Sequence, residues 1–457
     1  MRVFMLGWEF PPFISGGLGT ACYGLTKAMS SLGTDVMFVL PRPVSNPFST
    51  HVRLVSPRAD SPLAAPSTEF RLDEFENVTF RTVNAQLSPY QRPREKKRAE
   101  SPVIEKTRML KATVVEPSAE ASKPGESTQQ AMASAAAARS PYAGDLFLEI
   151  QRYAALASEV ARGQDFDVVH AHDWMTFPAG LAVAAMKGAP LVVHVHSTEF
   201  DRSGQNVNQR IYDIERRGMH GAMKIIAVSH LTRNICAHHY GVDPSKIEVV
   251  YNAIDMNGNG FDEEKYSIHK DEKIVLFLGR ITMQKGPEYF LAAAKKVLEV
   301  IDNVKFVMAG SGDMIRRIIE MAAAMGIGHK VLFTGFLRGA DVDKVFKMAD
   351  LYVMPSVSEP FGIAPLEAMS HDVPVLISKQ SGVSEVLTHA LKCDFWDINE
   401  MANKIIAVLR HPPLASTLRQ HGAIDVRRRT WVDAAKQCLA VYESALHMIN
   451  GRQAVAT

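Results

Sequence analysis

Short apolar runs, each followed by a stretch with helical periodicity, constrain the fold of this chain more than any other feature. They occur in two series: 3–7, 35–40, 167–170, 190–196, 222–229 and 247–250, then 273–278, 305–308, 331–334, 351–354 and 374–377. Strands that alternate with helices form parallel sheets, and near-continuous apolar strands indicate that helices cover both faces. We therefore predict an α/β protein of two doubly wound lobes that face a cleft.

The same patterns divide the chain into segments. A first Rossmann-like lobe spans 1–252, a polar linker 253–271 and a second lobe 272–430, and a last helix covers 431–457. Residues at about 88–140 interrupt the first lobe with a basic run and a Ser/Glu/Pro/Ala-rich stretch. Such a segment buries too little apolar surface to order itself, so we predict a flexible insertion there.

Composition excludes several classes of protein. The 457 residues are 47% hydrophobic and 22% charged, which is ordinary for a globular protein. Lys and Arg exceed Asp and Glu by 51 − 49 = 2, so charge gives no reason to expect nucleic acid as a partner. The four cysteines lie far apart, which argues against a disulfide scaffold or a cysteine zinc site. No segment resembles a signal peptide or a membrane span, and we expect a cytoplasmic protein without an integral membrane segment.

Glycines and cations follow two of the predicted strands. Gly16 and Gly17 lie between a strand and a helix N-terminus, where the backbone either binds an anion or merely makes a tight turn. Arg280 and Lys285 follow a strand of the second lobe, and two cations at this spacing can converge on one diphosphate.

Two glutamates flank a glycine turn after the strand at 351–354. Glu359 precedes the turn and Glu367 lies one turn into the following helix, where its carboxylate can accept both hydroxyls of a ribose. The N–H groups of Gly362, Ile363 and Ala364 can face a phosphate at the start of that helix.

Histidine pairs end two first-lobe strands. The pairs are His170 with His172 and His194 with His196. From the alternation of side chains along a strand, we expect only one histidine of each pair to face a given side of the sheet. No ligand spacing indicates a metal site, and we predict none. Asp173 and His196, at the strand ends, are the residues expected to meet a ligand.

Together these motifs resemble the retaining GT-B glycosyltransferases, and among them the glycogen and starch synthases. The resemblance rests on Gly16-Gly17, Arg280-x4-Lys285 and Glu359-x7-Glu367 within Ser-Glu-Pro-Phe-Gly, and on Thr430-Trp431 before the last helix. It implies the GT-B fold, in which the last helix returns to the N-terminal lobe. One position departs, because those synthases carry a lysine just before the two glycines, where this chain has Ile14-Ser15.

The resemblance also implies a role for each candidate residue. Arg280 and Lys285 would hold the nucleotide diphosphate together with the backbone of 362–364, and Glu367 would bind the ribose. Glu359 would lie by the donor sugar, and Asp173 and His196 would contact its hydroxyls. Gly16 and Gly17 would belong to the same nucleotide-sugar site.

The activity implied is a hexosyltransferase. It would move a hexose, with glucose expected, from UDP- or ADP-sugar to an acceptor hydroxyl of an α-glucan with retention, without a metal or other cofactor. The cations can stabilise the leaving diphosphate unaided, and the motifs contain no Asp-x-Asp. A lipid, cell-wall or small-molecule acceptor, an epimerase, and a non-catalytic nucleotide-sugar-binding regulator stay as alternatives, and a homo-oligomer is open.

Overall fold

The structure is a computed structural model that describes residues 1–10, 16–41, 68–70, 77–83, 85, 87, 144–254 and 272–456. By its internal contacts the chain divides into residues 1–85 with 150–457 on the one hand and 86–149 on the other. The predicted insertion at about 88–140 and most of the predicted linker at 253–271 lie outside the described residues.

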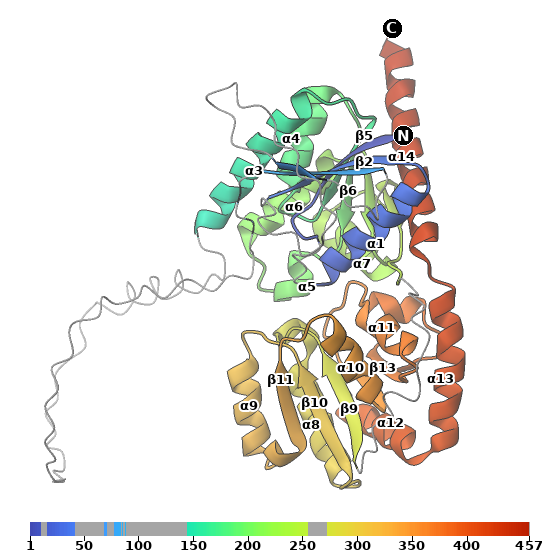
Figure 1. The fold of residues 1–457 in the computed structure, drawn as a ribbon. Helices are drawn as coiled ribbons and strands as arrows, with labels where there is room; N and C mark the ends of the chain where they lie inside the picture. The colour runs from blue at the N-terminus through green and yellow to red at the C-terminus, as the bar shows by residue number, and fades with distance from the viewer. Residues whose placement is uncertain are drawn as a thin grey trace, which may run out of the picture. The chain divides into compact units, whose positions relative to one another are not determined.

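The first sheet is built almost entirely from the N-terminal half of the chain (Figure 1). Its strands are β1 (Arg2–Leu6), β2 (Asp35–Leu40), β3 (Thr68–Phe70), β4 (Val78–Thr82), β5 (Val168–His172), β6 (Leu191–Val195), β7 (Lys224–Ala227) and β8 (Ile247–Val249). They lie in the order β3-β4-β2-β1-β5-β6-β7-β8, and all pair in parallel except β3 with β4. The helices between them are α1 (Gly17–Ser31), α3 (Gly144–Arg162), α4 (Phe177–Lys187), α5 (Glu199–Ser203), α6 (Gln209–Gly221) and α7 (His230–Tyr240).

The second sheet is wholly parallel, in the order β11-β10-β9-β12-β13-β14 (Figure 1). Its strands are β9 (Lys273–Leu278), β10 (Val304–Ala309), β11 (Val331–Gly335), β12 (Leu351–Met354), β13 (Val375–Ser378) and β14 (Leu391–Cys393). Its helices are α8 (Pro287–Leu298), α9 (Ile315–Ala324), α10 (Ala340–Met348), α11 (Ala364–Ser370), α12 (Ile398–Arg410) and α13 (Pro412–Arg427). The prediction of two doubly wound α/β lobes is confirmed.

Each sheet has a point at which the strand order reverses. In the first sheet β1 lies between β2 and β5, and in the second β9 lies between β10 and β12. At each reversal, the loops that follow two neighbouring strands turn to opposite faces of the sheet: β1 and β5 in the first sheet, β9 and β12 in the second. A crevice forms between these loops at the carboxyl ends of the strands, where open α/β sheets bind ligands. The segments that follow β1, β5, β9 and β12 carry most of the candidate residues.

The last helix, α14 (Trp431–Ala456), returns to the N-terminal half, as predicted. It packs against α1 and contacts β6 and β7 (Figure 1). Two contacts hold α14 in place: the Tyr442 hydroxyl forms a hydrogen bond with Nδ1 of His170, and the Trp431 ring lies over Gly24 of α1.

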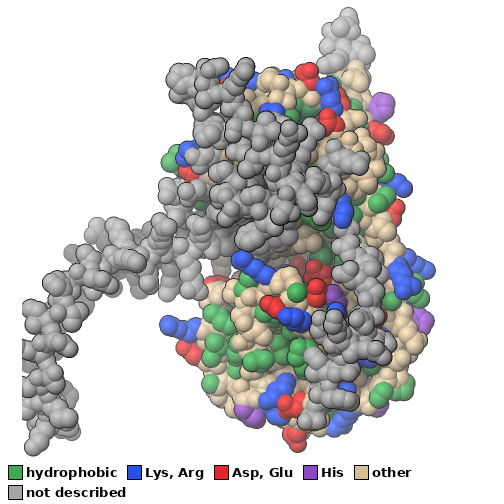
Figure 2. Space-filling view, viewed as in Figure 1, with side chains coloured by type: hydrophobic (Ala, Val, Ile, Leu, Met, Phe, Trp, Pro, Cys, Tyr) green, Lys and Arg blue, Asp and Glu red, His purple; other side chains and the backbone are tan. Residues whose placement is uncertain are grey.

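Charged side chains of both signs are mixed over the described residues of the face drawn in Figure 2. This mixture gives no broad field of one sign on that face to attract a polyanion. In the part of the chain that the structure describes, no helix combines the length and the apolarity needed to cross a bilayer.

Candidate functional site

An ion pair joins the loops that follow β9 and β12. Nζ of Lys285 bonds Oε2 of Glu359, which also accepts a hydrogen bond of 3.1 Å from the Ser356 hydroxyl. Glu359 is buried and Lys285 is largely so, with side chains 8% and 21% exposed. Because β9 and β12 are neighbours at the reversal of strand order, this pair lies where a ligand of the second sheet is expected.

The backbone after Glu359 turns sharply into α11. Gly362 has φ +95°, and a Cβ at this residue would lie 3.0 Å from Cγ of Glu359 and 3.2 Å from Sδ of Met354, so a side chain fits poorly. The N–H groups of Gly362, Ile363 and Ala364 have no acceptor among the described residues. The loop thus presents N–H groups beside the Lys285–Glu359 pair.

Glu367 lies in the first turn of α11 and is partly buried. Burial raises the pKa of its carboxyl to about 7, and the negative charge of Asp343 adds to the shift. A carboxyl that titrates near neutral pH is typical of a functional site, although structural groups also show it.

Arg280 lies in the loop between β9 and α8, two residues after the strand ends. This loop ends in a short 3-10 helix, Met283–Lys285, so both predicted cations belong to one connection. The loop is packed closely against its neighbour, because a Cβ at Gly310 would lie 1.9 Å from the Gly279 carbonyl oxygen.

Asp173 and His196 lie side by side after β5 and β6. Oδ1 of Asp173 accepts the backbone N–H of His196 at 2.7 Å and that of Ser197 at 3.4 Å. Asp173 has the left-handed φ of +59°, which few non-glycine residues adopt. Burial raises the pKa of its carboxyl to about 7, against the lowering effect of the His196 N–H. Asp173 therefore holds the loop that carries His196, a role beyond the sugar contact predicted from the sequence.

The predicted division of the histidine pairs between two faces is wrong. Residues two apart on a strand share a face, and the rings of His170, His172, His194 and His196 form one stacked group. Ring centroids are 4.2 Å apart for His170 and His172 and 4.1 Å for His194 and His196.

Three of these rings bring a nitrogen within 4.8 Å of one another: those of His170, His172 and His194. Their planes are inclined by only 12° to 29°. A metal ion lies in the plane of each imidazole that ligates it, and nearly parallel stacked planes do not meet near the nitrogens. The rings as they stand therefore do not form a ligand set.

The glycine loop ends at α1 as expected, with Gly16 before the helix and Gly17 as its first residue. The structure adds a residue that the sequence analysis missed: Oε2 of the buried Glu9 accepts the N–H of Gly19 at 3.3 Å. A carboxylate thus lies at the N-terminus of α1, where an anionic ligand was one possibility. The sequence feature that could have indicated this contact is the acidic residue between β1 and the two glycines.

Hydrogen bonds join the Glu359 loop to the N-terminal half. The Ser358 hydroxyl donates to Oδ1 of Asp201 at 2.6 Å, and the Ser229 hydroxyl donates to the Pro360 carbonyl oxygen at 2.5 Å. The residues on both sides of Glu359 are therefore held by the first half of the chain.

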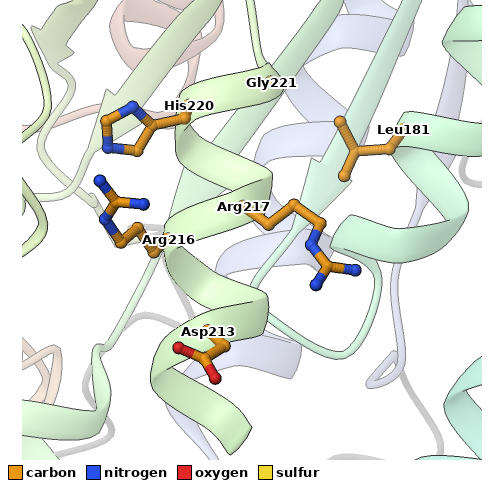
Figure 3. A pocket seen from close by; sticks show the side chains of 6 residues that line it. All are labelled: Leu181, Asp213, Arg216, Arg217, His220 and Gly221. Atoms are coloured by element: carbon orange, nitrogen blue, oxygen red, sulfur yellow. The ribbon is translucent and has the colours of Figure 1, made fainter. Parts of the chain in front are cut away.

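A separate surface pocket of about 570 Å³ lies on α6 and α4. It is lined by Leu181, Asp213, Arg216, Arg217, His220 and Gly221, and the two arginines extend to different sides of α6 (Figure 3). None of the candidate residues lines this pocket.

Two Rossmann-like sheets with polar and charged residues at both reversals, and a last helix that crosses back, define a GT-B fold. Family models agree along the chain: "Glycosyl transferases group 1" matches 259–424, "Glycosyltransferase Family 4" matches 111–257 and "Starch synthase catalytic domain" matches 2–97. An uncharacterized glycosyltransferase of Methanocaldococcus jannaschii is 34% identical over 303 residues, 62% of this chain and 77% of that protein. The chain belongs to the group 1 glycosyltransferases.

Two further proteins are similar over almost the whole chain. The glycogen synthase of Mycobacterium tuberculosis H37Rv is 24% identical over 455 residues, which cover 98% of this chain and 94% of that protein. The structure of a sucrose-phosphate synthase from Thermosynechococcus elongatus superposes with a TM-score of 0.68 at 18% identity, covering 98% and 99% of the two chains. The predicted likeness to the glycogen and starch synthase group is confirmed.

Proposed function

We propose that this glycosyltransferase moves glucose from UDP- or ADP-glucose to a hydroxyl of an α-glucan, with retention of the anomeric configuration. The observation that carries the proposal is the Lys285–Glu359 ion pair beside the N–H groups of 362–364. A diphosphate that entered there would exchange one anionic partner of Lys285 for another and would gain N–H donors. Similarity to a glycogen synthase supports the glucose donor and the glucan acceptor.

The chemistry follows from where charge develops. As the bond between sugar and phosphate breaks, negative charge grows on the diphosphate, and Arg280, Lys285 and the backbone N–H groups stabilise it in a partly desolvated site. These groups supply the electrostatic stabilisation without a metal ion. The acceptor then attacks from the same face, and the departing phosphate takes its proton. Glu367 accepts the ribose hydroxyls, and Asp173 and His196 face the donor sugar.

One observation favours a second acceptor class. The N-terminus of α1 has the Glu9 carboxylate where an anionic ligand would otherwise bind, and Ile14-Ser15 stands where glycogen synthases have a lysine. A carboxylate beside Gly16 and Gly19 repels phosphate and accepts hydroxyls. A neutral polyol or a lipid-linked sugar would bind there as readily as a glucan end.

A primed transfer assay tests the proposal. Purified protein is incubated with UDP-, ADP- or GDP-glucose, with and without glycogen, and the anomeric proton of the product is followed by NMR. We expect release of nucleoside diphosphate that depends on glycogen, and an α-linked product. Release that does not depend on glycogen but does depend on a small polyol would favour the second acceptor class. A β-linked product would contradict retention.

A further inference from the structure

The inference starts from a hydrogen bond between two imidazoles. Nδ1 of His172, the last residue of β5, lies 2.9 Å from Nε2 of His196, which follows β6. His172 is fully buried and His196 is partly exposed. A neutral imidazole donates from one nitrogen and accepts at the other, so exactly one of these two rings can donate to the other.

The surroundings of His172 decide which ring donates. Its other nitrogen, Nε2, is buried and has no hydrogen-bond partner among the described residues. If His196 donated, His172 would have to carry its hydrogen on Nε2 and bury an N–H without an acceptor. Because an unpaired buried N–H is the costlier arrangement, His172 donates from Nδ1. His196 then accepts at Nε2 and carries its hydrogen on Nδ1.

Both rings are neutral at pH 7, because burial disfavours the charged form of an imidazole. Burial lowers the pKa of His196 to about 3. Burial lowers the pKa of His172 well below its usual value, and the neighbouring rings of His170 and His196 add to the lowering.

The ring of His196 is also held on other sides. It stacks on His194 at 4.1 Å between centroids, and its backbone N–H bonds Asp173 at 2.7 Å. Its Nδ1 is left without a partner among the described residues. We propose that His172 is a positioning residue that selects the tautomer and ring orientation of His196, so that His196 offers an N–H from Nδ1 to the donor sugar. The inference rests on the proposed function, because it needs His196 at that sugar.

Paired substitutions separate positioning from packing. His172→Phe and His194→Phe both keep a flat ring in the stack, but only the first removes a hydrogen bond to His196, since neither nitrogen of His194 has a partner among the described residues. Turnover is measured as nucleoside diphosphate release from UDP- or ADP-glucose with glycogen. We expect kcat to fall at least about 10-fold in His172→Phe with KM for the donor little changed, and less than about 2-fold in His194→Phe.

Amide substitutions guard against a variant that simply folds poorly. His172→Asn places an N–H near the position of Nδ1, whereas His172→Gln places it near that of Nε2. We expect Asn to restore a substantial part of kcat and Gln to restore little. Equal kcat for Asn and Gln, or equal losses in His172→Phe and His194→Phe, would overturn the proposal.

The variant His196→Phe tells this proposal apart from the proposed function. If His172 acts through His196, His172→Phe added to His196→Phe should lower kcat no further. If His172→Phe lowered kcat as much in the His196→Phe background as it does in the wild type, the positioning role of His172 would be overturned. If His196→Phe alone left kcat unchanged, the role of His196 under the proposed function would be wrong, and positioning would be wrong with it.

Discussion

Asp173 and Glu367 place titratable carboxyl groups in the two halves of the candidate site. Burial raises the pKa of each to about 7, so a small change in pH near neutrality alters the charge of the site. The two groups differ in their surroundings. Asp173 already accepts two backbone N–H groups, whereas the raised pKa of Glu367 reflects burial and the charge of Asp343. Each therefore gives a separate prediction.

Asp173→Asn should stabilise the protein at alkaline pH. Folding raises the pKa of Asp173 from 3.8 to about 7, so its ionisation destabilises the folded state progressively between those pH values. Asparagine keeps the oxygen that accepts the N–H of His196, tolerates a positive φ and does not ionise. We expect a free energy of unfolding higher than that of the wild type by on the order of 2 kcal/mol at pH 8, and a difference near zero at pH 4. A difference that does not change with pH would contradict this account.

Glu367 should make donor binding depend on pH. Under the proposed function its carboxylate, present above about pH 7, accepts ribose hydroxyls at both oxygens, so KM for the donor should fall from pH 6 to pH 8. Glu367→Gln should raise KM about 10-fold at pH 8 and remove most of the pH dependence. Asp343→Asn removes the neighbouring charge and should move the transition to lower pH. The exposed Glu320→Gln is the control, and a transition unmoved by Asp343→Asn would argue against the assignment.

At the scale of elements, the contact between α1 and α14 ties the C-terminal helix to the first sheet. It depends on a glycine, because a Cβ at Gly24 would lie 2.2 Å from the indole ring of Trp431. Trp431 is 5% exposed, so its ring has little room to move away. The start of α14 is therefore sensitive to a single methyl group on α1.

Gly24→Ala should destabilise the protein by about 1–3 kcal/mol through overpacking, despite the better helix propensity of alanine. The measurement is denaturant unfolding. Gly163→Ala, just after the end of α3, is the control for the added methyl group, because a Cβ there meets no atom within 4 Å. Equal stability of the two variants would show that Trp431 does not fix the position of α14.

The helical and strand patterns were enough to predict most elements, including β2, β9 and β12 with the bounds that the structure has. The strands missed were β3, β4 and β14. Two of them are only three residues long, too short for a periodic signal, and all three lie at or beside a sheet edge. Their pairing depends on tertiary contacts that local sequence does not encode.

The candidate residues followed from strand ends and known motif spacing, whereas their partners did not. Glu9 at α1, the bond from His172 to His196 and the contact of Ser358 with Asp201 each join residues whose proximity arises only in the folded chain. The histidine prediction failed for another reason, because side chains two apart on a strand share a face.

At the scale of the whole molecule, the halves meet through a carboxylate at a helix end. Glu385, in the short 3-10 helix Gly382–Glu385, accepts the N–H of His230 at 2.9 Å and that of Leu231 at 2.8 Å, both in the first turn of α7. The Tyr251 hydroxyl donates to the same carboxylate at 3.0 Å. An acid at a helix N-terminus is favoured by the helix dipole, so this contact couples the second half to α7.

Glu385→Ala should release the first turn of α7. We expect hydrogen exchange at the amides of His230 and Leu231 to speed up about 10-fold, while exchange in β7 stays the same. Glu400→Ala, which removes an ion pair with Lys404 within the second half, is the control. Unchanged exchange at α7 in Glu385→Ala would mean that the carboxylate does not hold the two halves together.

The central claim is that the charge of Lys285 stabilises the departing diphosphate. Lys285→Gln keeps a hydrogen-bond donor for Glu359 and removes the charge, and Lys296→Gln makes the same change at an exposed position on α8. Steady-state turnover of UDP- or ADP-glucose with glycogen is the measurement. We expect kcat to fall at least about 100-fold in Lys285→Gln, with the melting temperature retained, and to stay within about 2-fold of the wild type in Lys296→Gln. Near-normal turnover in a folded Lys285→Gln protein would contradict the claim.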